Sequence, residues 1–410
     1  MKIKSIKARE ILDSRSNPTV EVKMVLENEI SAIASIPSGA STGSREAIEL
    51  RDKDENRYHG KGVLNAVNNV NNIIAPKLIG LELNQREIDN ILLELDGTYN
   101  KANLGANAIL GVSLAALKCL AKNEGKELYE YVSSGRYTLP IPMINVINGG
   151  AHADNNLDIQ EFMIVPLLET EEKRVRAASE VFITLKGMLK NDNLATGVGD
   201  EGGFAPNLPS NEECFKYLVK AIEKTGYVPG RDIALAIDAA ASEFYNKETK
   251  EYTLDGQKYT ADMLNSYYLD LINKYPIISI EDPFDEDDVE SFAKLTKEAG
   301  DRIMVVGDDF FVSQSKYLQM GIDNKAANAI LLKANQVGTI SEFFETIKLA
   351  RDNNYQMIIS HRSGETEDTF IADLAVGLNL TYIKTGSVSR GERIAKYNRL
   401  LGIEIDINEN

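Results

Sequence analysis

The sequence has only two cysteines among 410 residues and no long apolar run. Cys119 and Cys214 are far apart and lack the spacing of a metal site, so neither a disulfide framework nor a cysteine-based metal site is expected. No run approaches the ~20 apolar residues that span a bilayer. The first ten residues, MKIKSIKARE, also lack the apolar centre of a signal peptide. We therefore expect a soluble, cytoplasmic protein without a membrane partner.

Positive charge is also scarce, because 45 Lys and Arg residues face 62 Asp and Glu residues and leave a formal charge of −17. A surface that binds nucleic acid needs a basic patch to replace condensed counterions, so no nucleic-acid partner is expected. The length exceeds one ordinary hydrophobic core. Two domains are therefore expected, either one large and one small or two of similar size.

The first third of the chain predicts a small α+β domain. Residues 3–36 alternate apolar and polar positions around turn candidates, which indicates a three-stranded antiparallel meander with one buried face. The small-residue stretch PSGASTGSR (37–45) is either a flexible surface loop or a mobile lid. Helical patterns follow over 84–95 and 105–121. A Ser-Ser-Gly turn at 133–135 and prolines at 140 and 142 favour a boundary between domains 1–135 and 136–410.

The remaining residues predict an α/β barrel. Strand-like runs at 141–147 and 160–166 are joined by a segment too short for a helical crossover, so they should be antiparallel. Two helical segments follow, at about 171–190 and 211–225. Six apolar runs then end at intervals of 23 to 43 residues, which are the lengths of βα units. Two strands plus six give a C-terminal eight-stranded α/β (TIM-like) barrel with the irregular order ββαα(βα)6.

The strand ends of such a barrel all face one mouth. Here they carry three carboxylates, Asp238, Glu281 and Asp308. A single carboxylate at a strand end is usually a helix cap or a salt-bridge partner. Three on adjacent strands would repel one another unless they held a hard cation such as Mg²⁺, so we favour a metal site.

The same mouth should hold cationic and hydroxyl groups, Lys333, Lys384 and His361-Arg362-Ser363-Gly364. The last four residues precede a helix predicted to begin near Thr366 and suit a phosphate group, although a structural salt bridge of Arg362 is an alternative. An acidic molecule needs bound metal to attract such an anion. Lys333, beside Mg²⁺ and Lys384, should have a pKa lowered towards that of a usable base.

These residues lie within long strings that resemble the enolase family over nearly the whole chain. The strings include AREILDSRSNPTVEV (8–22), PSGASTG (37–43), GANAILGVSLA (105–115), INGGAHADN (147–155), GDEGGFAPNL (199–208), IEDPF (280–284), LLKANQVGT (331–339) and SHRSGETED (360–368). The resemblance implies a glycolytic lyase that reversibly dehydrates 2-phospho-D-glycerate to phosphoenolpyruvate through an aci-carboxylate intermediate. It also implies a homodimer or an octameric ring of dimers.

The resemblance further implies a role for each matched residue. Asp238, Glu281 and Asp308 would hold the first of two Mg²⁺ ions, and Ser41 in the lid would hold the second, which arrives with substrate. Lys333 would be the base that removes the C2 proton, and Glu201 the acid that assists loss of the C3 hydroxyl. The other implied substrate contacts are His152, Glu161, His361, Arg362, Ser363 and Lys384.

Two alternatives are weaker. A racemase or cycloisomerase of the same superfamily would be expected to carry a Lys-x-Lys pair at the end of an early barrel strand, and residues 160–166 contain no lysine. A non-catalytic descendant would be expected to have lost a ligand or the base, and all of these positions are intact.

Overall fold

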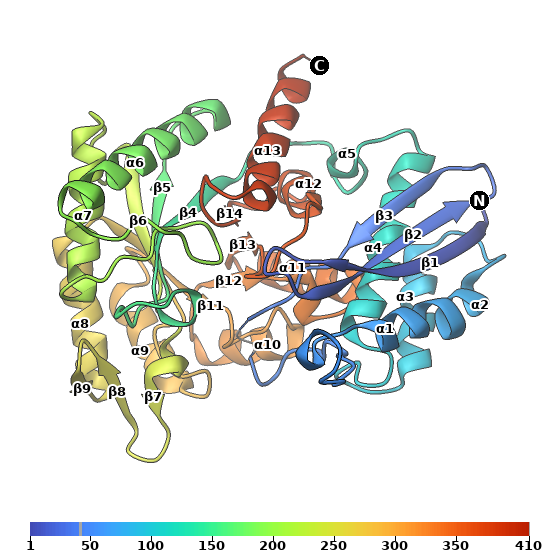
Figure 1. Ribbon diagram of the computed structural model, residues 1–410, viewed down its shortest axis with the longest axis horizontal. Helices are drawn as coiled ribbons and strands as arrows, with labels where there is room; N and C mark the ends of the chain where they lie inside the picture. Colours follow the sequence, from blue (N-terminus) through green and yellow to red (C-terminus); the bar gives the residue numbers. More distant parts are fainter. Residues whose placement is uncertain (41–42, 410) are drawn as a thin grey trace.

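The computed structural model describes residues 1–40 and 43–409, which form an N-terminal sheet with its helices beside a large barrel (Figure 1). The sheet consists of β1 (Ile3–Leu12), β2 (Pro18–Leu26) and β3 (Ser31–Ser35), paired antiparallel in that order. Val20, Val22 and Met24 of β2 are fully buried. The predicted meander with one buried face is confirmed.

The N-terminal helices cover the buried face of this sheet. Helix α3 begins where predicted, after Asn84, whose side chain accepts a hydrogen bond from the Glu87 backbone N–H. Helix α4 packs directly on β2, where a Cβ on Gly111 would lie 2.5 Å from Val22, so glycine permits the close approach. The segments are η1 (Tyr58–Gly60), α1 (Leu64–Asn68), the π-helical η2 (Asn69–Ile74), α2 (Ala75–Leu78), α3 (Gln85–Asp96), α4 (Ala106–Asn123) and α5 (Leu128–Tyr131).

The barrel is closed, with the strand order β10-β11-β12-β13-β14-β4-β5-β6. Strand β5 runs antiparallel to both β4 and β6, and the other neighbours are parallel. The predicted eight strands and antiparallel start are therefore confirmed. The strands are β4 (Ile141–Asn148), β5 (Glu161–Pro166), β6 (Ile233–Asp238), β10 (Ile277–Glu281), β11 (Met304–Gly307), β12 (Ala329–Leu332), β13 (Gln356–Ser360) and β14 (Tyr382–Lys384).

Helices α6 and α7 lie between β5 and β6 in the chain, and one helix follows each later strand, which confirms the order ββαα(βα)6. A small sheet of β7 (Tyr245–Asn246), β8 (Glu251–Leu254) and β9 (Gln257–Tyr259) precedes α8. The helices are α6 (Glu171–Asn191), α7 (Asn211–Lys224), α8 (Ala261–Lys274), α9 (Val289–Ala299), α10 (Ser315–Asn324), α11 (Ile340–Asp352), α12 (Phe370–Gly377) and α13 (Gly391–Glu409), with short 3₁₀ turns η3 (Gly150–His152), η4 (Ala241–Phe244) and η5 (Ala334–Gln336).

One predicted helix start was wrong. The helix after β13 begins at Phe370 rather than near Thr366. Contacts with the N-terminal part hold the intervening segment extended: Ser38 and Gly364 exchange two backbone hydrogen bonds of 2.8 Å, and the Thr366 hydroxyl donates to the Ser35 carbonyl. Arg362 and Ser363 therefore lie in a loop that is attached to the other domain.

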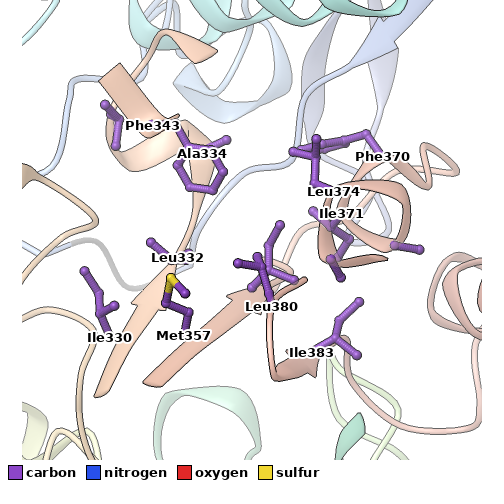
Figure 2. Packing of buried hydrophobic residues seen from close by; sticks show 14 of the residues in the cluster. Ile330, Leu332, Ala334, Phe343, Met357, Phe370, Ile371, Leu374, Leu380 and Ile383 are labelled. Atoms are coloured by element: carbon purple, nitrogen blue, oxygen red, sulfur yellow. The ribbon is translucent and has the colours of Figure 1, made fainter. Parts of the chain in front are cut away.

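The barrel strands are buried on both faces, as strands of a parallel sheet require. Leu331 and Ile358 point into the barrel, whereas their neighbours Ile330, Leu332 and Met357 point outwards. Figure 2 shows the outer layer, in which Ile330, Leu332, Met357 and Ile383 pack towards Phe343 of α11 and Phe370, Ile371 and Leu374 of α12. Each such side chain contributes about 1.5–3 kcal/mol through burial. This packing fixes the strand ends that carry the polar groups.

The predicted domain boundary near residue 135 falls in the segment between α5 and β4. No helix within the described part of the chain is both long enough and apolar enough to cross a membrane.

Candidate active site

The predicted strand-end residues lie together at the carboxyl end of the barrel. Asp238 and Glu281 are the last residues of β6 and β10, and Lys384 is the last residue of β14. Asp308, Lys333 and His361 each follow directly after β11, β12 and β13. Closure of the barrel thus brings together groups that are up to 146 residues apart in the chain.

Lys384 occupies the centre of this mouth and is 2% exposed. Its Nζ lies 3.0 Å from Asp238 Oδ2, 2.8 Å from Glu281 Oε2 and 3.1 Å from Glu161 Oε1. Burial lowers its pKa, but the three carboxylates more than reverse this and raise the pKa well above its ordinary value. Lys384 is therefore a permanent cation that bridges two of the predicted metal ligands.

Lys333 forms an ion pair with Asp308 Oδ2. The other oxygen, Asp308 Oδ1, accepts a hydrogen bond of 3.0 Å from Gln336. Burial lowers the pKa of Lys333, but Asp308 raises it, and the net shift is upwards. The lowered pKa predicted from sequence refers to the site with Mg²⁺ bound and stays a prediction, whereas in the metal-free site the ion pair with Asp308 keeps Lys333 charged.

Glu161 and Glu201 form a carboxyl pair that faces His152 and His361. His152 Nδ1 lies 3.6 Å from Glu161 Oε1 and 3.5 Å from Glu201 Oε1. His361 Nε2 lies 3.3 Å from the same Glu201 oxygen, and Asn145 donates a hydrogen bond of 2.9 Å to Glu201 Oε2. One carboxyl group is thus shared by two imidazoles and an amide.

The environment separates the pKa values of these groups. Burial and the charge of Glu201 raise the pKa of Glu161 well above its ordinary value. Burial alone would raise the pKa of Glu201 too, but His152, His361 and Arg393 hold it well below its ordinary value. Burial lowers the pKa of His152, and lowers that of His361 to about 4. At neutral pH the site therefore holds two neutral imidazoles and an ionised Glu201, and Glu161 is the more readily protonated of the two carboxyl groups.

The predicted phosphate contacts lie at the junction with the N-terminal domain. Arg362 forms a bidentate ion pair with Glu46, with NH1 at 2.9 Å and NH2 at 3.1 Å, and its NH1 also donates to Asn335 Oδ1. Ser363 Oγ accepts a hydrogen bond of 2.7 Å from the Ala40 backbone N–H. The described part of segment 37–45 therefore contacts a predicted phosphate ligand, Ser363. Ser41 lies outside the described residues.

Two family models match the chain: the enolase N-terminal domain over residues 3–132 and the enolase C-terminal TIM barrel domain over residues 136–410. The chain belongs to the enolase family. The match covers both the N-terminal sheet and the barrel, and enolases are carbon–oxygen lyases with phosphopyruvate hydratase activity. This enolase is accordingly an enzyme.

The mouth of this enolase has the chemistry of a Mg²⁺ site. A cavity of about 30 Å³ lies among the charged side chains, enough for an ion or a water molecule. Burial and the charge of Asp238 raise the pKa of Glu281 well above its ordinary value. A divalent cation would offset the repulsion between these two carboxylates. Carboxylate oxygens are the ligands that Mg²⁺ prefers, so Asp238, Glu281 and Asp308 fit the ion.

The compact groups of possible ligands are different from this predicted set. Within residues 1–40 and 43–409, two groups of three residues have possible ligand atoms that lie within 4.8 Å of one another. One group is His152, Glu161 and Glu201, and the other is Asp282, Asp308 and Asp309. Asp238 and Glu281 are instead held by the Lys384 ammonium. Asp308, the predicted ligand in the second group, contacts Lys333 and Gln336.

Several supporting residues had no assigned role at the level of sequence. Asp282, at a positive φ of 41°, accepts hydrogen bonds from the backbone N–H groups of Asp308 and Asp309 at 2.9 and 2.7 Å. It therefore fixes the turn that presents Asp308. Gln160, Gln336, Asn145, Glu46 and Arg393 likewise contact predicted site residues. Gln160 and Gln336 lie beside predicted residues in the family strings, but Arg393 carries no local signal.

Proposed function

We propose that this enolase catalyses the reversible, Mg²⁺-dependent dehydration of 2-phospho-D-glycerate to phosphoenolpyruvate. The observation that carries this proposal is the content of one buried mouth. It contains Lys333 and the carboxyl pair of Glu161 and Glu201, and Arg362 lies at its edge. Removal of a proton next to a carboxylate and loss of a hydroxyl need one base and one acid. Lys333 and the carboxyl pair of Glu161 and Glu201 support these two roles.

Asp238, Glu281 and Asp308 would hold the first Mg²⁺, and Ser41 would join the second. When bound, the ions would supply the positive charge that a substrate with a phosphate and a carboxylate requires. Arg362 and Ser363 would bind the phosphate, and Lys384, His361 and His152 would contact the rest of the substrate. Arg362 donates two hydrogen bonds to the Glu46 carboxylate, and this bidentate geometry supports the binding of a phosphate group by the same donors.

Lys333 is the proposed base for the C2 proton. Its Nζ can take a proton only after giving one up, and Asp308 opposes that loss in the metal-free site. A change of partner for Asp308 on ligand binding would free Lys333 for this role. The base therefore depends on what occupies the Asp308 carboxylate.

Glu201 is the proposed acid for the C3 hydroxyl and needs a proton when it acts. The raised pKa of Glu161 makes it the more readily protonated carboxyl group of the metal-free site, and His152 Nδ1 lies within 3.6 Å of both carboxyl groups. We infer that the proton moves from Glu161 to Glu201 within this pair. The separated pKa values mark the two carboxyl groups as a coupled acid–base pair, and the transfer requires that bound substrate raise the proton affinity of Glu201.

We further propose a cytoplasmic enzyme that assembles as a homodimer or as an octameric ring of dimers. Both cysteines are free and buried, which suits a reducing compartment. The assembly follows from the family resemblance.

A coupled spectrophotometric assay of the purified protein with 2-phospho-D-glycerate and Mg²⁺ tests the activity. The wild type should convert substrate, and Lys333→Ala should not. Lys297→Ala, which changes an exposed lysine on α9, should match the wild type. Absence of conversion by the folded wild type with Mg²⁺ would exclude the proposed activity.

A further inference from the structure

Arg393, near the start of α13, has the largest side chain among the fully buried residues described in the structure. Its NH1 lies 2.5 Å from His361 Nδ1 and donates to the Arg362 carbonyl at 2.7 Å. Its NH2 donates to the carbonyls of Ser363 and Asp200 at 2.7 and 3.2 Å. One guanidinium therefore joins the loop that carries His361 to the loop that carries Glu201.

The contact with Arg393 determines which nitrogen of His361 carries the proton. A guanidinium has donors and no acceptor, so His361 Nδ1 must be the accepting nitrogen. The proton of the neutral imidazole then lies on Nε2. This nitrogen faces Glu201 Oε1 at 3.3 Å and has no other hydrogen-bond partner among residues 1–40 and 43–409.

Close packing holds the three groups in this arrangement. Gly386 follows β14 at a φ of +77°, and a Cβ there would lie 2.8 Å from both Arg393 Cδ and the Glu201 carbonyl. The same Cβ would lie 3.1 Å from His361 Cε1. Only glycine fits at this point, so backbone and side chains leave His361 little freedom to turn.

We propose that Arg393 is a positioning residue that holds His361 as a neutral imidazole with its proton on Nε2, aimed at Glu201. This inference rests on the proposed roles of Glu201 and His361. It implies that His361 orients Glu201 and binds substrate but does not supply the proton for the C3 hydroxyl. That proton must then come from the carboxyl pair of Glu161 and Glu201.

The charges around the ring support this assignment. Burial lowers the pKa of His361 to about 4, Glu201 and Glu365 oppose that shift, and Arg393 reinforces it. Removal of the Arg393 charge should therefore raise the pKa of His361 towards its ordinary value of 6.5. An imidazole that titrates near neutral pH would no longer be a fixed donor.

The chain contains only three histidines, so its imidazoles can be resolved by nuclear magnetic resonance. Full-length protein labelled with ¹⁵N-histidine would be recorded in long-range ¹H–¹⁵N spectra, with His361→Gln to assign the signals. The substrate-free wild type should show His361 neutral and protonated on Nε2 at pH 7 and at pH 5.5. A proton on Nδ1, or an imidazolium at pH 7, would overturn the proposal.

Arg393→Met tests the cause, and Lys396→Met is its matched control. Lys396 lies on the same helix, is equally buried, and donates to Glu365 Oε2 at 2.8 Å and the Thr366 carbonyl at 2.7 Å without touching His361. Arg393→Met should mix the tautomers of His361, raise its pKa and lower kcat about 10- to 100-fold with a smaller change in KM. Lys396→Met should leave the proton of the neutral His361 imidazole on Nε2.

Unchanged His361 signals in Arg393→Met, or equal changes in Lys396→Met, would overturn the role of Arg393. If Arg393→Met does not fold, the wild-type tautomer still decides, because a proton on Nδ1 is incompatible with the Arg393 contact. If the tautomers behave as expected but the wild type does not convert 2-phospho-D-glycerate, the proposed function fails while the positioning role stands.

Discussion

Replacement of Lys384 by methionine should destabilise the metal-free enzyme, because its ammonium lies 2.8 to 3.1 Å from three buried carboxylates. Removal of one partner from a buried ion pair costs about 3–5 kcal/mol. For 410 residues, an unfolding entropy of about 2.1 cal/mol/K per residue gives about 0.9 kcal/mol/K. The thermal midpoint in the presence of chelator should therefore fall by about 3–6 °C.

The deficit of Lys384→Met should depend on pH. Burial and Asp238 raise the pKa of Glu281, burial and Glu201 raise that of Glu161, and Lys384 opposes both shifts. A carboxyl group whose pKa is raised in the folded state stabilises the fold at low pH and loses that contribution as pH rises through the folded pKa. Without Lys384 both pKa values rise further. The difference from the wild type should thus be smaller at pH 5 than at pH 8.

Mg²⁺ should restore more stability to Lys384→Met than to the wild type, since Asp238 and Glu281 are no longer held by an ammonium group. Lys396→Met is the control, because this buried lysine pairs with one carboxylate, Glu365, away from the predicted ligands. It should lose stability without any extra gain from Mg²⁺. Equal midpoints for Lys384→Met and the wild type in chelator, or equal gains from Mg²⁺, would refute the reasoning.

Three further outcomes are expected. Excess chelator should abolish conversion of 2-phospho-D-glycerate and Mg²⁺ should restore it, whereas full activity after metal removal would exclude the metal role. Lys333→Ala should lose both turnover and exchange of the C2 hydrogen in heavy water. Glu201→Gln should keep this exchange, and its product formation should fall by a factor on the order of 10². Nuclear magnetic resonance of the substrate measures the exchange, and the reverse pattern would show that the two roles are exchanged. Substrate with Mg²⁺ should protect segment 37–45 from limited proteolysis, and equal protection by Mg²⁺ alone would show that the segment is not coupled to substrate.

Much of the fold was determined by local sequence. The alternation in β2 and the Asn84 cap of α3 are local signals, and both elements formed as predicted. The short connection between β4 and β5 excludes a helical crossover, so the antiparallel start of the barrel follows from chain length alone. Regular spacing of the later strands was enough to place Asp238, Glu281 and Lys384 at strand ends.

The tertiary structure decided which groups meet and in what protonation state. Arg362 pairs with Glu46, 316 residues away, and Arg393 reaches His361 from a helix that has no motif. The late start of α12 follows from contacts with Ser38, and the raised pKa of Lys333 in the metal-free site follows from its ion pair with Asp308. Burial and distances of about 3 Å between chain-distant groups set these properties, and no local pattern contains either quantity.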